Sequence, residues 1–307
     1  MTGVLEGFTV IFVVIALGYL LARFEVLGEH GQFVLSRLVF FVATPALLFV
    51  TLGTSDLSVI LSPILVIAGT TALMVGAIHF LIAKLLLDRA VPEATIGGLA
   101  ASYVNAANLG IPIAVYVLGD ATFVAPLLLF QIMIYSPIAL TILDLSTQGK
   151  KASIRNIVVT PFTNPIVLAG AAGLALSISG LTLPDALMQP FELVGGAAVP
   201  GALLAFGLSL YGTRVLQRGV SPRRDVALAS TLKMVLQPLL GFSMALAMGL
   251  EGQQLFAITV ISALPTAQNV FVFASRYNRG VVLARDTAFV TTLVSVPVIA
   301  AVSLLLA

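Results

Sequence analysis

The stretch that decides the fold is residues 102–112, Ser-Tyr-Val-Asn-Ala-Ala-Asn-Leu-Gly-Ile-Pro. It lies inside a long apolar run and places two carboxamides, Asn105 and Asn108, three residues apart on one helix face. Pro112 lacks the N–H that would bond to the carbonyl of Asn108. Because lipid cannot satisfy that carbonyl, it must face protein, water or a ligand. The stretch therefore predicts a broken helix that lines a cavity.

A second stretch, residues 262–269, has the same character and reads Ser-Ala-Leu-Pro-Thr-Ala-Gln-Asn. Pro265 frees the carbonyl of Ile261, and two carboxamides, Gln268 and Asn269, follow. If both helices unwind and cross at mid-membrane, the N-terminal ends of the half-helices beyond the breaks present N–H groups and partial positive charge toward the crossing. Neutral carboxamides can donate to a carboxylate there without the cost of a permanent charge in the membrane.

The two stretches together predict a binding site for a small organic anion. Its expected residues are Asn105, Asn108, Pro112, Pro265, Gln268 and Asn269. The alternative for the four carboxamides is interhelical hydrogen bonding, which contributes about 0.6 kcal/mol on average in membranes.

Composition places these stretches in a membrane protein. The 307 residues are 59% hydrophobic and only 9% charged, and the mean hydropathy is +1.12. A chain of this composition has too little polar surface for a water-soluble globule, so the lipid bilayer is its expected solvent. The net charge of +2 is sparse and interrupted by apolar runs, which excludes a nucleic-acid-binding surface. The absence of cysteine excludes disulfides and thiolate chemistry.

Apolar runs long enough to cross a hydrocarbon core of roughly 30 Å predict ten transmembrane helices. They cover approximately residues 5–22, 33–52, 59–83, 94–118, 121–143, 157–178, 193–211, 226–249, 253–275 and 286–306. Of the 15 Lys and Arg residues, 13 fall in alternate loops, namely Arg23, Lys84, Arg89, Lys150, Lys151, Arg155, Arg214, Arg218, Arg223, Arg224, Arg276, Arg279 and Arg285. The intervening loops hold Asp56, Asp120, Asp185 and Glu251. By the positive-inside rule, both termini are expected outside the cell.

The expected organisation is two inverted five-helix repeats, because an odd number of spans in each half turns the second half upside down. The first repeat covers residues 1–145, a short cytoplasmic linker covers 146–156, and the second repeat covers 157–307. Pro45 and Pro200, in similar local sequences, are 155 residues apart, and Pro112 and Pro265 are 153 residues apart. These two pairs predict one repeat register.

Charged residues within or near the spans suggest how transport could be coupled. His79 is a candidate for proton coupling, with a simple hydrogen bond near the helix end as the alternative. Lys233 and Arg37 are expected to snorkel toward the interface. Alternatively, Lys233 pairs with an acidic residue such as Asp144 or attracts anions. No carboxylate is expected at mid-membrane, which argues against a cation or proton antiporter. A sodium-coupled symporter stays open, because carbonyl and carboxamide oxygens can bind Na⁺.

Two other functional classes compete with a transporter. An intramembrane enzyme would need paired aspartates, a serine nucleophile motif or a His-Glu metal cluster in the spans, and none is present, so we expect no catalytic residue, metal site or cofactor beyond a coupling H⁺ or Na⁺. A membrane receptor or a channel is the other alternative, and the inverted repeat favours a carrier over both.

The spacing Asn-x-x-Asn-x-Gly-Ile-Pro of residues 105–112 resembles the fourth span of the auxin efflux carrier family. The ninth span agrees in Ala263-Leu264-Pro265, Phe271-Val272-Phe273-Ala274 and Tyr277-Asn278, and Thr163-Asn164-Pro165 resembles the opening of the family's sixth span. Plant PIN-type members have a second proline at the crossing where this chain has Val270. The short linker also makes this chain similar to compact bacterial or archaeal members.

The resemblance implies a fold and a mechanism. Spans 1, 2, 6 and 7 would form a scaffold domain, and spans 3–5 and 8–10 a transport domain that carries substrate by an elevator movement about crossed helices. The implied substrates are organic anions, either auxin-like acids or dicarboxylates such as malate and malonate, and Asn105 matches the family's substrate-binding asparagine. The implied location is the plasma (inner) membrane, and the resemblance leaves room for a homodimer through the scaffold.

Overall fold

The computed structural model describes residues 2–54, 63–148, 165–181, 183–212 and 215–306. In this part of the chain the backbone is helical apart from short connections and one isolated antiparallel bridge between Val104 and Thr266. Five described helical segments are long and apolar enough to cross a membrane: Gly31–Gly53, Pro63–Leu85, Asp185–Leu210, Arg223–Ala247 and Val281–Leu306. Shorter apolar helices cover Phe12–Arg23, Ala106–Leu118, Ala121–Phe130 and Pro165–Ser179. These helices confirm the expectation of an all-α polytopic membrane protein, and the ten-span inverted repeat stays a prediction.

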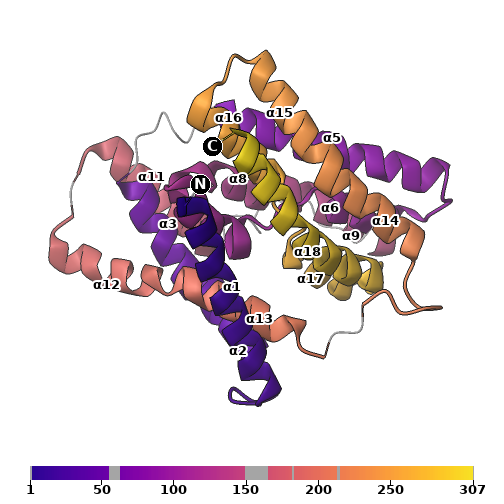
Figure 1. The fold of residues 1–307 in the computed structure, drawn as a ribbon, viewed down its shortest axis with the longest axis horizontal. Coiled ribbons are helices and arrows are strands. Elements are labelled where there is room, and N and C mark those ends of the chain that lie inside the picture. The colour runs from indigo at the N-terminus through magenta and orange to yellow at the C-terminus, as the bar shows by residue number, and fades with distance from the viewer. Residues whose placement is uncertain (1, 55–62, 149–164, 182, 213–214, 307) are drawn as a thin grey trace. The chain divides into compact units, whose positions relative to one another are not determined.

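The chain forms two compact units, each built from segments that are distant in sequence (Figure 1). Unit 1 takes in the described residues of Met1–Ser62, Ala107–Leu129 and Pro161–Thr213. Its main helices are α1 (Thr2–Arg23), α2 (Gly31–Leu38), η1 (Val39–Ala43), α3 (Thr44–Gly53), α7 (Ile111–Ile113), η3 (Ala114–Leu118), η4 (Ala121–Phe123), α11 (Pro165–Ser179), α12 (Asp185–Gly196) and α13 (Ala198–Leu210).

Unit 2 takes in the described residues of Pro63–Ala106, Phe130–Thr160 and Arg214–Ala307. Its helices are α5 (Pro63–Leu85), α6 (Val91–Ser102), η5 (Gln131–Tyr135), α9 (Ser136–Gln148), α14 (Arg223–Thr231), η7 (Leu232–Leu236), α15 (Gln237–Ala247), α16 (Gly252–Ser262), α17 (Gln268–Tyr277) and α18 (Val281–Leu306). Two helical stretches, η2 (Ala106–Gly110) and α8 (Ala125–Phe130), each continue across a boundary between the units.

Within unit 1, the close approach of α1 and α13 depends on two glycines. A Cβ on Gly18 would collide with the carbonyl oxygen of Leu204, and a Cβ on Gly207 would collide with that of Ile15. The two backbones therefore touch directly. Small residues allow this kind of contact between helices in lipid, where association depends on van der Waals packing.

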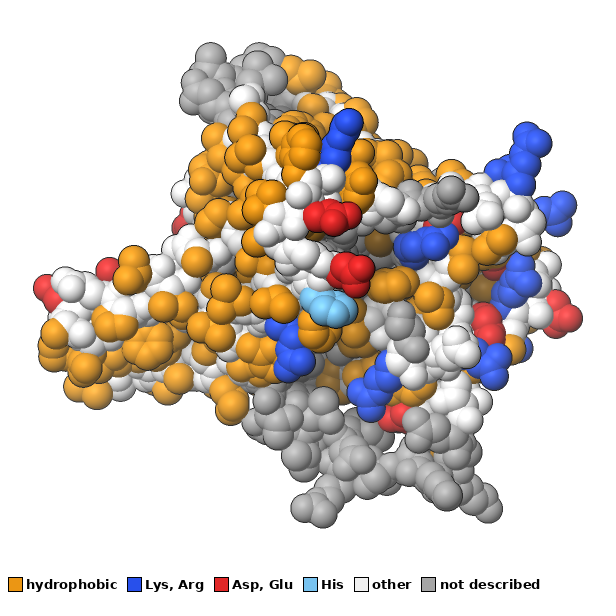
Figure 2. Space-filling model, turned by 90° about the horizontal axis from the view of Figure 1, so that it is seen from below, with side chains coloured by type: hydrophobic (Ala, Val, Ile, Leu, Met, Phe, Trp, Pro, Cys, Tyr) orange, Lys and Arg blue, Asp and Glu red, His pale blue; other side chains and the backbone are white. Residues whose placement is uncertain are grey.

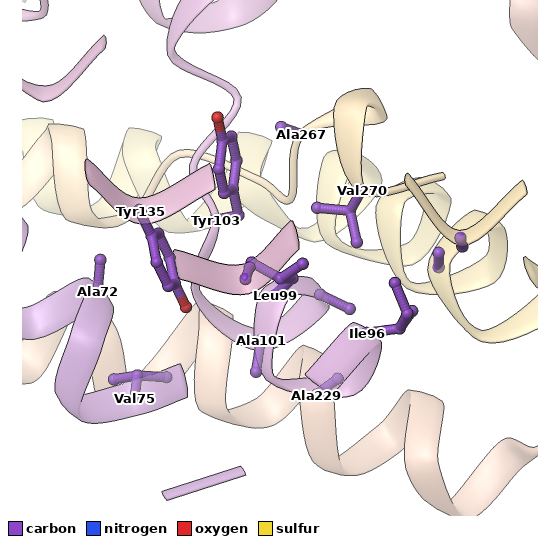
Figure 3. Packing of buried hydrophobic residues seen from close by; sticks show 14 of the residues in the cluster. Ala72, Val75, Ile96, Leu99, Ala101, Tyr103, Tyr135, Ala229, Ala267 and Val270 are labelled. Carbon is purple, nitrogen blue, oxygen red and sulfur yellow. The ribbon is translucent and has the colours of Figure 1, made fainter. Parts of the chain in front are cut away.

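Within unit 2, a hydrophobic core joins α5, α6, α9, α14 and α17. Figure 3 shows Leu99 and Ala101 of α6 among side chains that come from the neighbouring helices. In both units, many apolar side chains remain exposed outside the cores, as Leu193 of unit 1 (80% exposed) and Leu305 of unit 2 (82% exposed) illustrate. Hydrophobic side chains also cover much of the face seen in Figure 2. Such a surface suits a lipid environment.

Four prolines follow π-helical turns at one fixed spacing. Pro45, Pro112, Pro137 and Pro238 each lie two residues after the end of a π turn, which covers Val39–Ala43, Ala106–Gly110, Gln131–Tyr135 and Leu232–Leu236, respectively. A proline cannot donate to the carbonyl four residues earlier, and its ring crowds that carbonyl. The wider turn before it accommodates both effects, so the helix continues through the proline.

This pattern corrects the expected break at Pro112. The helical stretch Ala106–Leu118 runs through Pro112, and the interruption lies earlier, at Tyr103–Asn105. Pro265, in contrast, lies within the interruption between α16 and α17. The two prolines are therefore not at equivalent positions relative to the breaks. The linker from residue 149 onward and the motif residues Thr163 and Asn164 lie outside the described residues.

Candidate functional site at two paired helix breaks

The candidate site is built where two helices of unit 2 stop and their chains continue in extended form. Helix α6 ends at Ser102, and α16 ends at Ser262. The segments that follow pair in antiparallel fashion through Val104 and Thr266. The N–H of Asn105 donates to the carbonyl of Pro265 over 2.8 Å, and the N–H of Ala267 donates to the carbonyl of Tyr103 over 3.0 Å. Each break therefore satisfies part of the other's backbone, as burial in an apolar environment requires.

Side chains from neighbouring elements satisfy further backbone groups at the breaks. The Nε2 of Gln131 donates to the carbonyl of Val104 over 3.0 Å. The hydroxyl of Thr266 donates to the carbonyl of Ala100 in the last turn of α6 over 2.6 Å, and the N–H of Thr266 donates to the hydroxyl of Thr291 over 3.1 Å. These bonds fix the extended segments in one conformation.

Three of the predicted carboxamides lie at these breaks. Asn105 is 2% exposed and immediately precedes the helical stretch that begins at Ala106. Gln268 and Asn269 are the first two residues of α17 and are half-buried. Since the first turn of a helix carries unbonded N–H groups and partial positive charge, all three side chains lie where an anion is favoured.

An aromatic pair adjoins the carboxamides. The rings of Tyr103 and Tyr135 stack with centroids 5.6 Å apart, and the ring of Phe273 meets Tyr103 edge-on at 6.2 Å. The two tyrosine hydroxyls point in opposite directions (Figure 3). The Tyr103 hydroxyl hydrogen-bonds to that of Ser136 at 2.8 Å, and the side chain of Asn269 lies near the same hydroxyl. The aromatic wall formed by Tyr103, Tyr135 and Phe273 therefore adjoins Asn269.

Tyr135 connects this wall to the end of α6. Its hydroxyl lies 2.5 Å from the hydroxyl of Ser102, which also donates to the carbonyl of Gly98 over 2.8 Å. Gly76 of α5 leaves room for this contact, because a Cβ there would collide with the Tyr135 hydroxyl. Packing on α5 therefore sets the position of the aromatic pair.

The buried side chain of Lys233 contacts the C-terminal end of α16 directly and is linked to that of α6 through Gln237. The Nζ of Lys233 donates to Oε1 of Gln237 over 2.6 Å and to the carbonyl of Ser262 over 3.4 Å. The Nε2 of Gln237 in turn donates to the carbonyl of Ser102 over 3.2 Å. Lys233 is 0% exposed, so the expectation that it snorkels to the interface is wrong. Its polar partners lie inside the protein, and they take the place of interfacial water.

The remaining predicted residues lie apart from this network. The carboxylate of Asp144 accepts a hydrogen bond from the hydroxyl of Tyr277 over 2.7 Å. His79 is fully buried against Gly97, and among the described residues neither of its ring nitrogens has a hydrogen-bond partner. Asn108 and Pro112 belong to unit 1, where Asn108 is half-buried and Pro112 is buried. Arg37 stacks on the rings of Phe33 and Phe41 in unit 1.

Unit 2 also contains an ion pair that no local pattern in the sequence indicates. The guanidinium of Arg89 makes two bonds, of 2.9 and 2.7 Å, to the carboxylate of Asp225, which is buried. The Asp225 carboxylate raises the pKa of Arg89 above its usual value. Because 136 residues separate the two partners, only the tertiary structure pairs them.

A family model described as "Membrane transport protein" matches residues 4–303, nearly the whole chain. The chain belongs to this auxin efflux carrier-like family of membrane transporters. The resemblance seen in the sequence is thereby confirmed. This transporter is not an enzyme.

Similar proteins carry transporter names. A protein of Rhizobium meliloti (strain 1021) named "Putative malonate transporter" is 29% identical over 93% of this chain and 90% of its own length. An "Uncharacterized transporter" of Methanothermobacter thermautotrophicus is 28% identical over 93% of this chain and 92% of its own length. An "Uncharacterized transporter" of Escherichia coli (strain K12) is 26% identical over 87% of this chain and 86% of its own length.

Proposed function

We propose that this transporter carries a small dicarboxylate of the malonate or malate class, bound at the paired breaks of unit 2. The observation that carries the proposal is the backbone pairing of Asn105 with Pro265. The start of α17, with Gln268 and Asn269, follows directly after the segment that pairs with Tyr103–Asn105. Two helix N-termini and three carboxamides then converge on one region, which favours a carboxylate without using a charged side chain.

The roles of the individual residues follow from their chemistry. The amide groups of Asn105, Gln268 and Asn269 would donate to carboxylate oxygens. Pro265 would fix the chain path between α16 and α17, whereas Asn108 and Pro112 belong to unit 1 and have no role in this site. The name of the Rhizobium relative supports a dicarboxylate over an auxin-like acid.

The transport cycle that we propose is an elevator movement across a ten-span membrane domain with both termini outside, in the plasma membrane. The inverted arrangement of five and five spans that the sequence predicts is consistent with this cycle, because two repeats related by a pseudo-two-fold axis can exchange conformations between an outward-open and an inward-open state. The division into two compact units also supports a moving part and a fixed part. The segment Ala107–Leu129 groups with unit 1, so we place the boundary of the moving part within spans 4 and 5.

The function is tested with purified protein in proteoliposomes. Uptake of radiolabelled malonate should saturate with concentration, and unlabelled malonate inside the vesicles should accelerate it by counterflow. Flux that rises linearly without counterflow would indicate a channel, and binding without flux would indicate a receptor. Either result would contradict the proposed carrier.

A further inference from the structure

The most unusual group in unit 2 is the fully buried ammonium of Lys233. Among the described residues, the ion pairs are Arg89 with Asp225, Arg279 with Glu93, and Arg285 with Asp286, and none includes Lys233. A lysine inside a membrane protein without a carboxylate partner costs several kcal/mol unless other groups neutralise its charge. Its compensating charge must therefore come from another source.

The C-terminal ends of α6 and α16 at the two breaks supply this compensating negative charge. Ser262, whose carbonyl accepts directly from Lys233, is the last residue of α16, and Ser102, whose carbonyl is reached through Gln237, is the last residue of α6. The C-terminus of a helix carries about half a negative elementary charge. Two such ends together carry about one negative charge, which matches the single positive charge of the ammonium.

In transporters with broken helices, half-helix C-termini and unwound carbonyls are the groups that coordinate a coupling Na⁺. We propose that the ammonium of Lys233 is a tethered cation at this position, so that transport at this site needs no metal ion. This inference goes beyond the proposed function, because it concerns the coupling cation and not the carried anion. Lys233 acts as a positioning residue that holds the two helix ends together.

Oxygen atoms that could ligate a free cation surround the ammonium. They are Oε1 of Gln237 and the carbonyl of Ser262, which Lys233 contacts directly. The hydroxyl of Ser262 is also buried and has no hydrogen-bond partner among the described residues. Gly241 leaves room for that hydroxyl, because a Cβ at this position would collide with it. Carbonyl, carboxamide and hydroxyl oxygens are suitable ligands for a hard cation.

The test removes the tethered charge and offers free cations in its place. Thermal stability of purified wild type, Lys233→Ala and Lys233→Met would be measured without carboxylates, in NaCl and in choline chloride at equal ionic strength. Alanine leaves space for an ion, whereas methionine fills most of that space. We expect no specific Na⁺ effect on the wild type and a lower melting temperature for both variants in choline. A saturable upward shift with Na⁺ is expected in Lys233→Ala alone.

Propylammonium chloride provides a second probe, because it restores the atoms that the alanine variant lacks. It should raise the melting temperature of Lys233→Ala and leave Lys233→Met unchanged. Two results would overturn the proposal: a stability of Lys233→Ala equal to that of the wild type in choline, or a Lys233→Ala variant that is destabilised but indifferent to both Na⁺ and propylammonium.

The wild type keeps the proposal testable if the variants do not fold. Malonate uptake by wild-type proteoliposomes should be equal in NaCl and choline chloride, and a requirement for Na⁺ would contradict the tethered cation. This experiment compares the rate of malonate uptake between two salts, so it tests the need for Na⁺ separately from the question of whether malonate is carried. Absence of malonate uptake in both salts would count against the proposed substrate, and the cation-dependent stability of the variants would still decide the role of Lys233.

Discussion

The N–H of Asn105 donates to the carbonyl of Pro265 over 2.8 Å, which joins two helix breaks that lie 160 residues apart in the chain. The reciprocal bond from Ala267 to Tyr103 completes the pair. Neither break could remain extended alone in an apolar environment, because its backbone groups would lack partners. The pairing therefore explains why the breaks exist together, and it joins the segment that holds Asn105 to the segment that leads into Gln268 and Asn269.

Thr266→Val should destabilise the paired breaks. Valine keeps the shape but removes the hydroxyl that donates to the carbonyl of Ala100 over 2.6 Å. Leaving a buried acceptor without its donor costs about 1–3 kcal/mol. Thermal unfolding in detergent would measure the change. Thr141→Val is the matched control, because the Thr141 hydroxyl bonds within its own helix, to the carbonyl of Pro137, and a smaller loss is expected. Equal losses in both variants would contradict a special role for Thr266.

Pro112→Ala should leave the break in the fourth span intact. The interruption lies at Tyr103–Asn105 and is fixed by pairing with residues 265–267, whereas Pro112 lies in the helical stretch that follows. Melting temperature and stabilisation by malonate should both stay near the wild-type values. Loss of malonate stabilisation in this variant would show that Pro112 itself shapes the site.

The sequence predicted the location of the second break and the carboxamides beside it, because Pro265 disrupts a helix locally and Gln268 and Asn269 are close to it. It placed the first break wrongly, at Pro112. That proline follows a π turn that the sequence does not mark, and the true interruption depends on hydrogen bonds to residues 265–267.

The burial of Lys233 could not be predicted from the sequence either. Distance along the helix suggested that its side chain could reach the interface. Its actual environment depends on the end of α16, 29 residues away, and through Gln237 on the end of α6, 135 residues from Gln237. Pairing between such distant helix ends has no local signature, and for the same reason the ion pair of Arg89 with Asp225 could not be predicted.

Gly207→Ala should destabilise unit 1. The added Cβ would collide with the carbonyl oxygen of Ile15 and force α1 and α13 apart. Overpacking of this kind costs about 1–3 kcal/mol. Gly196→Ala is the control, because a Cβ there meets nothing within 4 Å, and alanine favours a helix by up to about 1 kcal/mol. Thermal melting of both variants tests this contrast, and a similar stability loss for Gly196→Ala would contradict it.

The proposed topology can be tested with single cysteines, because the native chain contains none. Glu251→Cys and Gln217→Cys lie at exposed positions in two loops that the charge pattern assigns to opposite sides of the membrane. In intact cells, a membrane-impermeant maleimide should label Cys at 251 and should label Cys at 217 only after lysis. The reverse pattern would place both termini in the cytoplasm.

The most direct test of the central claim is the melting temperature of the purified protein with increasing malonate, compared between wild type, Asn105→Ala and Gln254→Ala. A bound ligand stabilises the folded state by mass action, by about 2.7 kcal/mol at a concentration of 100 times Kd. The exposed carboxamide Gln254 serves as the control. Malonate should stabilise the wild type and Gln254→Ala equally, and it should have no effect on folded Asn105→Ala. Equal stabilisation of all three proteins would place the site elsewhere and contradict carboxylate binding at the paired breaks.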